Sequence, residues 1–145
     1  MIGTVGENAS LRRATCFKST NSITLSGFTH PATNASNSSI QLGKYGAIVA
    51  LHTTNDSVNN EVIKNVCQHI VGMNPNKIGV IDVDKPAENK DDEMLLVFQE
   101  YLLDPSQTVG ELLINHQIQV VNFHRYECGE LVQEQDKINL AKVRN

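Results

Sequence analysis

The sequence is short of the residues and runs that several functional classes require. It contains no tryptophan, and aromatic residues make up only 5% of its 145 positions. The formal net charge of −4 argues against a nucleic-acid surface, because such surfaces gather Lys and Arg to displace counterions. No apolar run approaches the roughly 20 residues that a membrane-spanning helix needs. We therefore expect a protein that contacts neither nucleic acid nor membrane directly.

Cysteines are too few and too scattered for a disulfide framework. Cys16, Cys67 and Cys128 form no C-x-x-C pair, and an odd, unpaired count suits a reducing compartment. The first residues show neither a signal peptide nor an Arg-rich, acid-poor transit peptide. We expect a protein that acts where it is made, or a chain that starts inside a longer precursor.

Motifs for catalysis, metal binding and phosphate binding are missing as well. The histidines include no H-x-x-x-H or H-E-x-x-H pair, and no glycine-rich phosphate loop occurs. Cys67 and His69 lie two residues apart on a predicted helix, so their side chains point about 200° apart. We interpret the histidines as surface or boundary residues and the carboxylates of Asp82–Asp92 as solvated. No catalytic residue, cofactor, metal or bound nucleotide is expected.

What the sequence does contain is the pattern of a mixed α and β domain. Strands are predicted at Ala9–Phe17 and Ser22–Thr29, which form a hairpin across a polar turn, and at Gln119–Cys128. The near-continuous apolar run of Tyr45–Thr53 is typical of a central strand.

Two helices are predicted between these strands. One begins at Asp56 or Ser57, carries a single apolar stripe as far as Val71, and ends before Asn74-Pro75. A shorter helix from Val109 to about His116 follows a capping-box pattern, Thr108 with Glu111. We expect an α+β fold, a largely antiparallel sheet of three to four strands with the helices packed on one face. Residues 1–130 would form this core, and residues 131–145 a charged tail.

A pair of leucines before a turn is harder to assign to the core. Leu102 and Leu103 point to opposite sides of an extended backbone, which Pro105 favours by biasing Asp104 away from helix. One leucine can therefore stay outside the core. Apolar residues at such bends are either ordinary edge-of-core residues or anchors for another protein.

Several segments in order resemble the elongation factor Ts family, from about Ile2 to Glu130. The segment V-G-E-N-A-S-L-R-R resembles the family's I-G-E-N-x-x-x-R-R, and L-L-D-P-S-Q-T-V-G-E-L-L resembles [VL]-[ML]-[ED]-P-S-x-T-V-G-x-L-L. The segment V-V-N-F-H-R-Y-E-C-G-E is similar to V-x-x-F-x-R-[FY]-E-[VC]-G-E, and L-G-K-Y-G-A-I-V-A-L and Q-H-I-V-G-M-N-P fit the same family. The Cys and Met variants favour its mitochondrial branch, which implies a mitochondrial location.

This resemblance implies a partner rather than a reaction. Elongation factor Ts is a guanine-nucleotide exchange factor that binds the GTPase elongation factor Tu and promotes GDP release during translation. The family's contact residues fall on Val5, Gly6, His30, Leu102 and Leu103. At His30 the fit is looser, because Pro31 stands where the family usually has glycine. The two leucines would then anchor a distal domain of elongation factor Tu, held extended by the following Asp104-Pro105.

Two departures from the family pattern qualify this expectation. Residues 76–98 are too few for the helical dimerisation insert of bacterial relatives, and the T-D-F-V segment that pushes in near the magnesium site is missing. The chain therefore resembles the C-terminal half of the core without the N-terminal helical domain, a truncated form with reduced exchange activity. Two alternatives stay open: a small enzyme that uses Cys67 or Cys128 with a histidine, and a fragment without function of its own.

Overall fold

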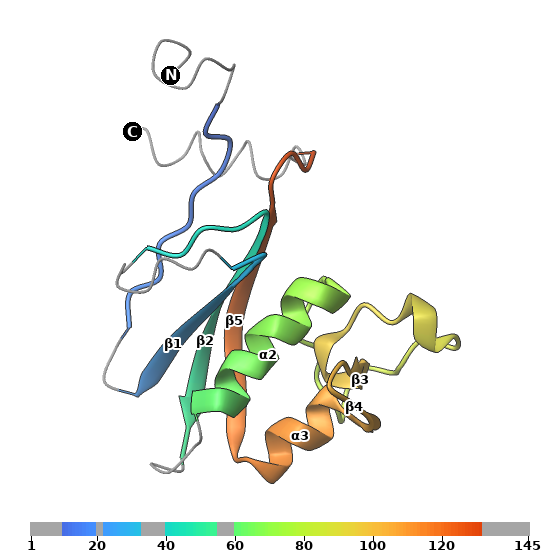
Figure 1. The fold of residues 1–145 in the computed structure, drawn as a ribbon. Coiled ribbons are helices and arrows are strands. Elements are labelled where there is room, and N and C mark those ends of the chain that lie inside the picture. The colour runs from blue at the N-terminus through green and yellow to red at the C-terminus, as the bar shows by residue number, and fades with distance from the viewer. Residues whose placement is uncertain (1–9, 20–21, 33–39, 55–59, 132–145) are drawn as a thin grey trace. The chain divides into compact units, whose positions relative to one another are not determined.

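The computed structural model describes residues 10–19, 22–32, 40–54 and 60–131. The chain divides into two compact units, Phe17–Cys128 and a smaller one made of Met1–Cys16 with Gly129–Asn145. Every helix and strand described lies in Phe17–Cys128 (Figure 1). In the smaller unit the described residues are irregular, and an ion pair joins Arg13 to Glu130. The division into a core of residues 1–130 and a tail stays a prediction.

The main sheet has three antiparallel strands in the order β1-β2-β5. These strands are β1 (Ile23–His30), β2 (Tyr45–Thr53) and β5 (Ile118–Glu127). The predicted central strand is confirmed, because β2 pairs along its whole length with β5 and from Tyr45 to His52 with β1. The alternation of β2 buries Val49 and Leu51 completely on one face.

Both helices cover that face of the sheet (Figure 1). Helix α2 (Asn60–Met73) lays its apolar stripe over β1 and β2, and the shorter α3 (Val109–Asn115) packs on β5. The capping box is confirmed: Thr108 Oγ1 accepts the Glu111 N–H, and the Glu111 carboxylate accepts the Thr108 N–H. The α+β fold is therefore as expected. The predicted start of this helix, at Asp56 or Ser57, lies outside the described residues.

The core is a single apolar cluster between the sheet and the helices. Its members come from β2, α2, α3 and β5, with Leu96 and Tyr101 from the segment that joins the helices. The fully buried side chains of largest volume are Leu51, Ile70, Leu96, His69, Val49, Val66, Val109 and Cys67.

A second, two-stranded sheet stands beside α2. It pairs β3 (Glu100–Tyr101) with β4 (Asp104–Thr108), and the chain reaches it through two single-turn 3₁₀ helices, η1 (Lys90–Asp92) and η2 (Leu96–Phe98). Gln99 connects this hairpin to α3, because its carbonyl accepts the N–H of Val109 at 2.9 Å. The hairpin is therefore fixed at its base to the core.

The predicted strand at Ala9–Phe17 is wrong in its described part. Residues 10–17 have no strand pairing, and Leu11 is 80% exposed. In the described residues, β1 forms a ladder with β2 alone. Alternating polar residues such as Arg12 and Thr15 look like one face of a strand, but a strand needs a partner as well as a pattern. The predicted hairpin is therefore absent from the described residues.

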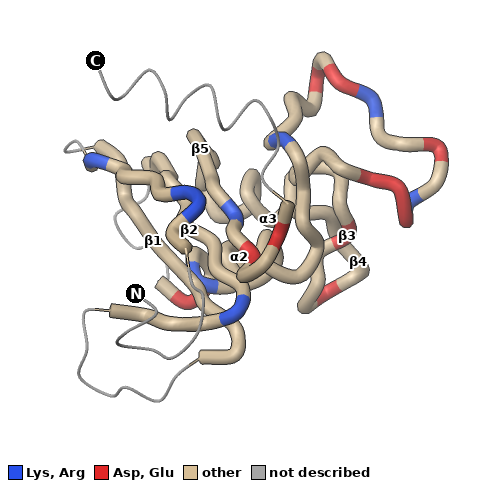
Figure 2. The backbone as a smooth tube through the Cα atoms, turned by 90° about the horizontal axis from the view of Figure 1, so that it is seen from above, with Lys and Arg blue, Asp and Glu red and all other residues tan. Residues whose placement is uncertain are grey.

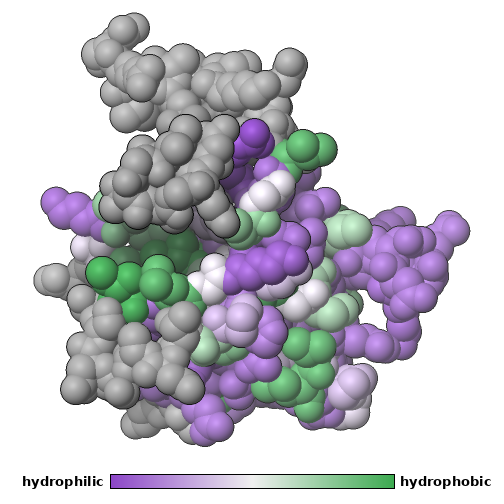
Figure 3. All heavy atoms as spheres, turned by 45° about the horizontal axis from the view of Figure 1, so that its top comes forward, coloured by the Kyte–Doolittle hydropathy of each residue, from purple (hydrophilic) through white to green (hydrophobic). Residues whose placement is uncertain are grey.

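The carboxylates of Asp82–Asp92 lie in an exposed loop between α2 and η2, as predicted. Figure 2 shows its acidic residues gathered along the loop, and Figure 3 shows a hydrophilic projection at the same side. Glu93 is instead buried, with its carboxylate oxygens accepting the N–H groups of Ala87 and Leu95 at 2.7 and 2.8 Å. Glu93 lies just beyond the Asp82–Asp92 carboxylates that were expected to be solvated, and its hydrogen bonds close the base of the loop.

Candidate docking surface

Leu102 and Leu103 form the tip of the β3–β4 hairpin. Tyr101 pairs with Asp104, so the two leucines are the whole connection between the strands. Their exposed fractions are 41% and 48%. The expected extended pose is therefore wrong: the backbone reverses at the leucines themselves, before Asp104-Pro105. The prediction that an apolar side chain stays outside the core holds for both.

The composition of this turn has no explanation within the chain. Two-residue hairpin turns favour glycine, asparagine or aspartate, whose backbones accept positive φ and whose side chains suit water. Here both positions are leucine, and neither has a positive φ. The backbone therefore accepts leucine, but contact with water favours polar side chains at such a turn, and burial does not explain the pair. An exposed apolar pair on a rigid turn is typical of a protein-binding anchor.

The hairpin is attached to α2 by three contacts that follow one another along the helix. Asn65, His69 and Met73 are spaced four residues apart, so they lie on one helical face. Asn65 hydrogen-bonds with the side chain of Tyr101, His69 Nδ1 accepts the N–H of Leu102 at 3.1 Å, and the Met73 carbonyl accepts from Gln99 at 3.3 Å. Residues 99, 101 and 102 are thus each fixed to a successive turn of the helix.

The His69 ring sits at the centre of this attachment and is fully buried. Its Nε2 lies 3.0 Å from Oε1 of Gln99. Because the Leu102 N–H donates to Nδ1, the proton must be on Nε2, which donates to Gln99. The Gln99 amide agrees with this assignment, since its NH₂ group donates to the carbonyls of Met73 and Glu93. Burial lowers the pKa of His69, so the ring is neutral near pH 7.

On the far side of the turn, Asp104 fixes the returning strand. Its carboxylate accepts from the hydroxyl and the N–H of Ser106, at 2.6 and 3.2 Å, and from Gln107 at 2.6 Å. These hydrogen bonds, the Ser106 hydroxyl first, lower the pKa of Asp104. The leucine turn is therefore held on both sides by polar contacts.

The other predicted contact residues lie elsewhere. His30 is exposed at the end of β1, opposite Tyr45, and so belongs to the three-stranded sheet and not to the leucine hairpin. Val5 and Gly6 lie outside the described residues. Of the five predicted contacts, the structure brings together only the two leucines among the residues that it describes.

Sequence reasoning missed His69, which was interpreted as a surface or boundary residue. That interpretation is wrong, because the ring is buried and hydrogen-bonded through both nitrogens. The available signal was its spacing: His69 follows Val66 by three residues, which places it at the edge of the apolar stripe. Its partner Gln99 is 2% exposed and gave no signal, because the contact spans 30 residues of sequence.

The geometry does not support thiol chemistry at Cys67. Burial raises the pKa of this thiol to about 11, against a smaller opposing effect of a hydrogen bond with Ser26. A protonated, enclosed thiol is a poor nucleophile. Cys128 is exposed. The ring of His124, the histidine on the strand before it, packs on the rings of Phe17 and Tyr126, with centroids 5.5 and 6.2 Å away, which does not support a pairing of this histidine with the Cys128 thiol.

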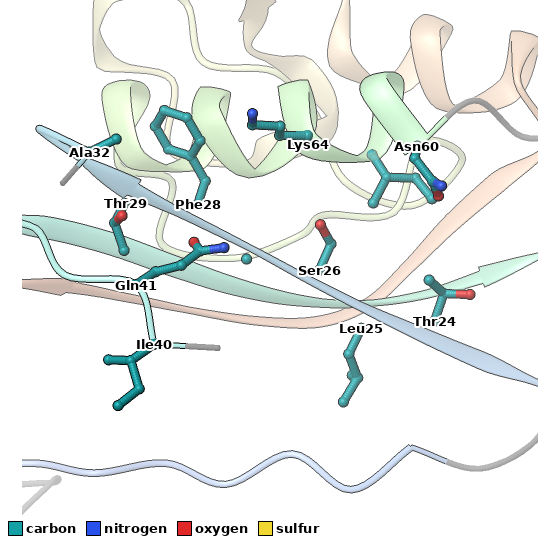
Figure 4. A pocket seen from close by; sticks show the side chains of 12 residues that line it. Thr24, Leu25, Ser26, Phe28, Thr29, Ala32, Ile40, Gln41, Asn60 and Lys64 are labelled. Carbon is teal, nitrogen blue, oxygen red and sulfur yellow. The ribbon is translucent and has the colours of Figure 1, made fainter. Parts of the chain in front are cut away.

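The cavity beside β1 offers no better candidate. A hollow of about 480 Å³ lies beside β1, where Ser26 and Phe28 point toward α2, and Leu25 points the other way (Figure 4). Its lining includes one charged side chain, Lys64, so it lacks the paired titratable groups that acid–base catalysis needs. Within the described ranges no three metal-ligating side chains come together. The described helices are all too short or too polar to cross a membrane.

Comparison with known proteins identifies the family. A model of the family described as "Elongation factor TS" matches residues 1–95, more than half of the chain. The chain belongs to the elongation factor Ts family. The resemblance noted in the sequence is thereby confirmed.

Relatives in this family match nearly the whole chain. The chain is 55% identical, over 90% of its length, to "Elongation factor Ts, mitochondrial" of Drosophila melanogaster. It is 54% identical over 94% to the protein of that name from Aedes aegypti, and 39% identical over 89% to the one from Homo sapiens. The chain spans 42%, 45% and 39% of these relatives. The predicted mitochondrial location is confirmed by these names.

Proposed function

We propose that this chain binds mitochondrial elongation factor Tu and acts as a guanine-nucleotide exchange factor in translation. Membership of the elongation factor Ts family supports the partner. Among the residues of this chain, the proposal is supported by the exposed leucine pair, which lies on a turn held by hydrogen bonds. No covalent step is required: exchange follows if the chain binds nucleotide-free elongation factor Tu more tightly than the GDP-bound form.

The leucine turn is suited to the anchoring role. Anchors of protein interfaces are apolar side chains whose conformation is set before binding, because ordering them on contact costs free energy. Leu102 is already fixed through its N–H, and Tyr101 and Asp104 on either side are paired. His30, Val5 and Gly6 are proposed as further contacts on the basis of the family pattern.

The experiment compares affinities for elongation factor Tu. Replacing both Leu102 and Leu103 by Ala should weaken the binding free energy by at least about 2 kcal/mol, because two central anchors are removed. This corresponds to a dissociation constant that is roughly thirtyfold higher. The matched control is Ile114→Ala, which truncates an apolar side chain on α3 that is 63% exposed. Isothermal titration calorimetry measures the affinity of the wild type, the double variant and Ile114→Ala for elongation factor Tu. Equal affinities for the double variant and the wild type would rule out the leucines as anchors.

A further inference from the structure

We propose that His69 is a positioning residue that holds the Leu102–Leu103 turn in the conformation that binds elongation factor Tu. The inference rests on the proposed function for its partner, and on the hydrogen bonds of the chain for its mechanism. It assigns a task in binding to a side chain that is itself fully enclosed. His69 would touch no partner atom and would act through the backbone of Leu102.

The ring of His69 has a fixed polarity. The Leu102 N–H requires an acceptor at Nδ1, and the Gln99 carbonyl oxygen requires a donor at Nε2. Gln99 cannot turn its amide around without losing two donations, to the carbonyls of Met73 and Glu93. The network therefore keeps the lone pair of Nδ1 directed at the tip of the hairpin.

The hydrogen bond that Leu102 donates to His69 fixes the turn. Leu102 occupies the first position of a two-residue connection, where the ladder between β3 and β4 does not reach. Its N–H is bonded instead to a rigid helix whose neighbouring side chains belong to the core. The position of the turn is thus set by α2, whereas a two-stranded hairpin alone would be only marginally stable.

The side chain of Leu102 also lies against α2. A Cβ added at Gly72 would lie 3.1 Å from Leu102 Cδ2, so this leucine rests against the backbone of the last turn of α2. His69 and Gly72 are three residues apart, so they lie on the same face at the C-terminal end of α2. One sets the backbone of Leu102 and the other leaves room for its side chain, while 41% of the residue stays exposed.

Two substitutions separate the two hydrogen bonds of the ring. In His69→Asn the amide oxygen takes the place of Nδ1 and can still accept from Leu102, but the contact with Gln99 is lost. In His69→Gln the amide nitrogen takes the place of Nε2 and can still donate to Gln99, but the acceptor for Leu102 is lost. Both variants lose the ring, so each is the other's control for a general loss of packing.

The experiment measures amide hydrogen exchange of the full chain by NMR and affinity for elongation factor Tu by calorimetry. In the wild type we expect the Leu102 amide to be protected although its residue lies at a surface turn. In His69→Gln its exchange should accelerate about tenfold or more, as expected for one lost hydrogen bond. The affinity should fall by a similar factor, and His69→Asn should stay closer to the wild type in both measurements.

The outcomes distinguish the inference from the proposed function. An unprotected Leu102 amide in the wild type overturns the inference, and this measurement needs no variant should His69→Gln fail to fold. Accelerated exchange with unchanged affinity overturns it as well, because the turn would be held without effect on binding. If the wild type does not bind elongation factor Tu at all, the proposed function fails, and with it the binding task of His69, whatever the exchange shows.

Discussion

Leu102 and Leu103 occupy exposed turn positions where contact with water favours polar residues. Their side chains are accessible, and the polar groups around them are satisfied: among the described residues no buried side-chain nitrogen or oxygen lacks a partner. Two apolar side chains are thus exposed to water although the polar groups around them are hydrogen-bonded. Such departures from the usual burial of apolar side chains are expected at functional sites.

The buried His69 makes the stability of the protein depend on pH. Burial lowers its folded-state pKa below the usual 6.5, so the unfolded chain takes up this proton more readily than the folded one. The neutral ring therefore contributes its full stability above about pH 6.5, and this contribution is lost as pH falls through the lowered folded pKa. Tyr101, whose ring centroid lies 6.0 Å from that of His69, stays neutral in this range because burial raises its pKa.

Urea unfolding at about pH 7 and about pH 5 tests this dependence. The free energy of unfolding should fall toward pH 5 by more in the wild type than in His69→Gln, since glutamine does not titrate. The remaining groups are common to both proteins and cancel in the comparison. Parallel losses in the two proteins would show that His69 titrates alike in the folded and unfolded states.

At the scale of elements, the sequence was most informative where a pattern was long. Three elements with clear signals were predicted. They are β2, from its apolar run of nine residues, α2, from its apolar stripe, and α3, from its capping box. The β3–β4 hairpin was not, because its strands are short and its turn lacks the glycine or asparagine that marks hairpins. The strand at Ala9–Phe17 was predicted from alternation alone, and alternation does not supply a partner.

The contact between α2 and the hairpin predicts opposite effects of one substitution. Gly72→Ala should raise the free energy of unfolding by up to about 1 kcal/mol, because alanine favours a helix. The new methyl would meet Leu102 Cδ2 at 3.1 Å, so this side chain, which is 41% exposed, would shift by a few tenths of an ångström from the position it has in the native turn. Affinity for elongation factor Tu should therefore fall while stability rises. Thermal unfolding and calorimetry on the same preparation measure both, and gains in stability and affinity together would contradict this reading of the contact.

At the scale of the whole molecule, the chain covers less than half of each of the three relatives compared above. The 145 residues contain no T-D-F-V segment, the part that the family resemblance assigns to the magnesium site of the partner. We therefore expect this chain to bind elongation factor Tu but to accelerate the release of GDP from it only weakly. Binding and exchange are separate properties, because a factor that does not discriminate between nucleotide states shifts no equilibrium between them.

Release of a fluorescent GDP analogue from elongation factor Tu measures the exchange activity. The rate with this chain should be well below the rate with a full-length relative, such as the Drosophila melanogaster protein, at concentrations that saturate binding. Rates that match at saturation would show that the residues present here are sufficient for exchange. That result would contradict the expectation of reduced activity and leave the proposed partner in place.

The central claim is that the leucine turn is covered when elongation factor Tu binds. The most direct measurement is a cysteine footprint, with Leu103→Cys or Ile114→Cys introduced after Cys16 and Cys128, both exposed, are replaced by Ser. Maleimide labelling of each variant is timed with and without elongation factor Tu, while Cys67 stays unreactive because it is buried. We expect strong protection at position 103 and none at position 114. Labelling at position 103 that proceeds equally fast in the complex would contradict it.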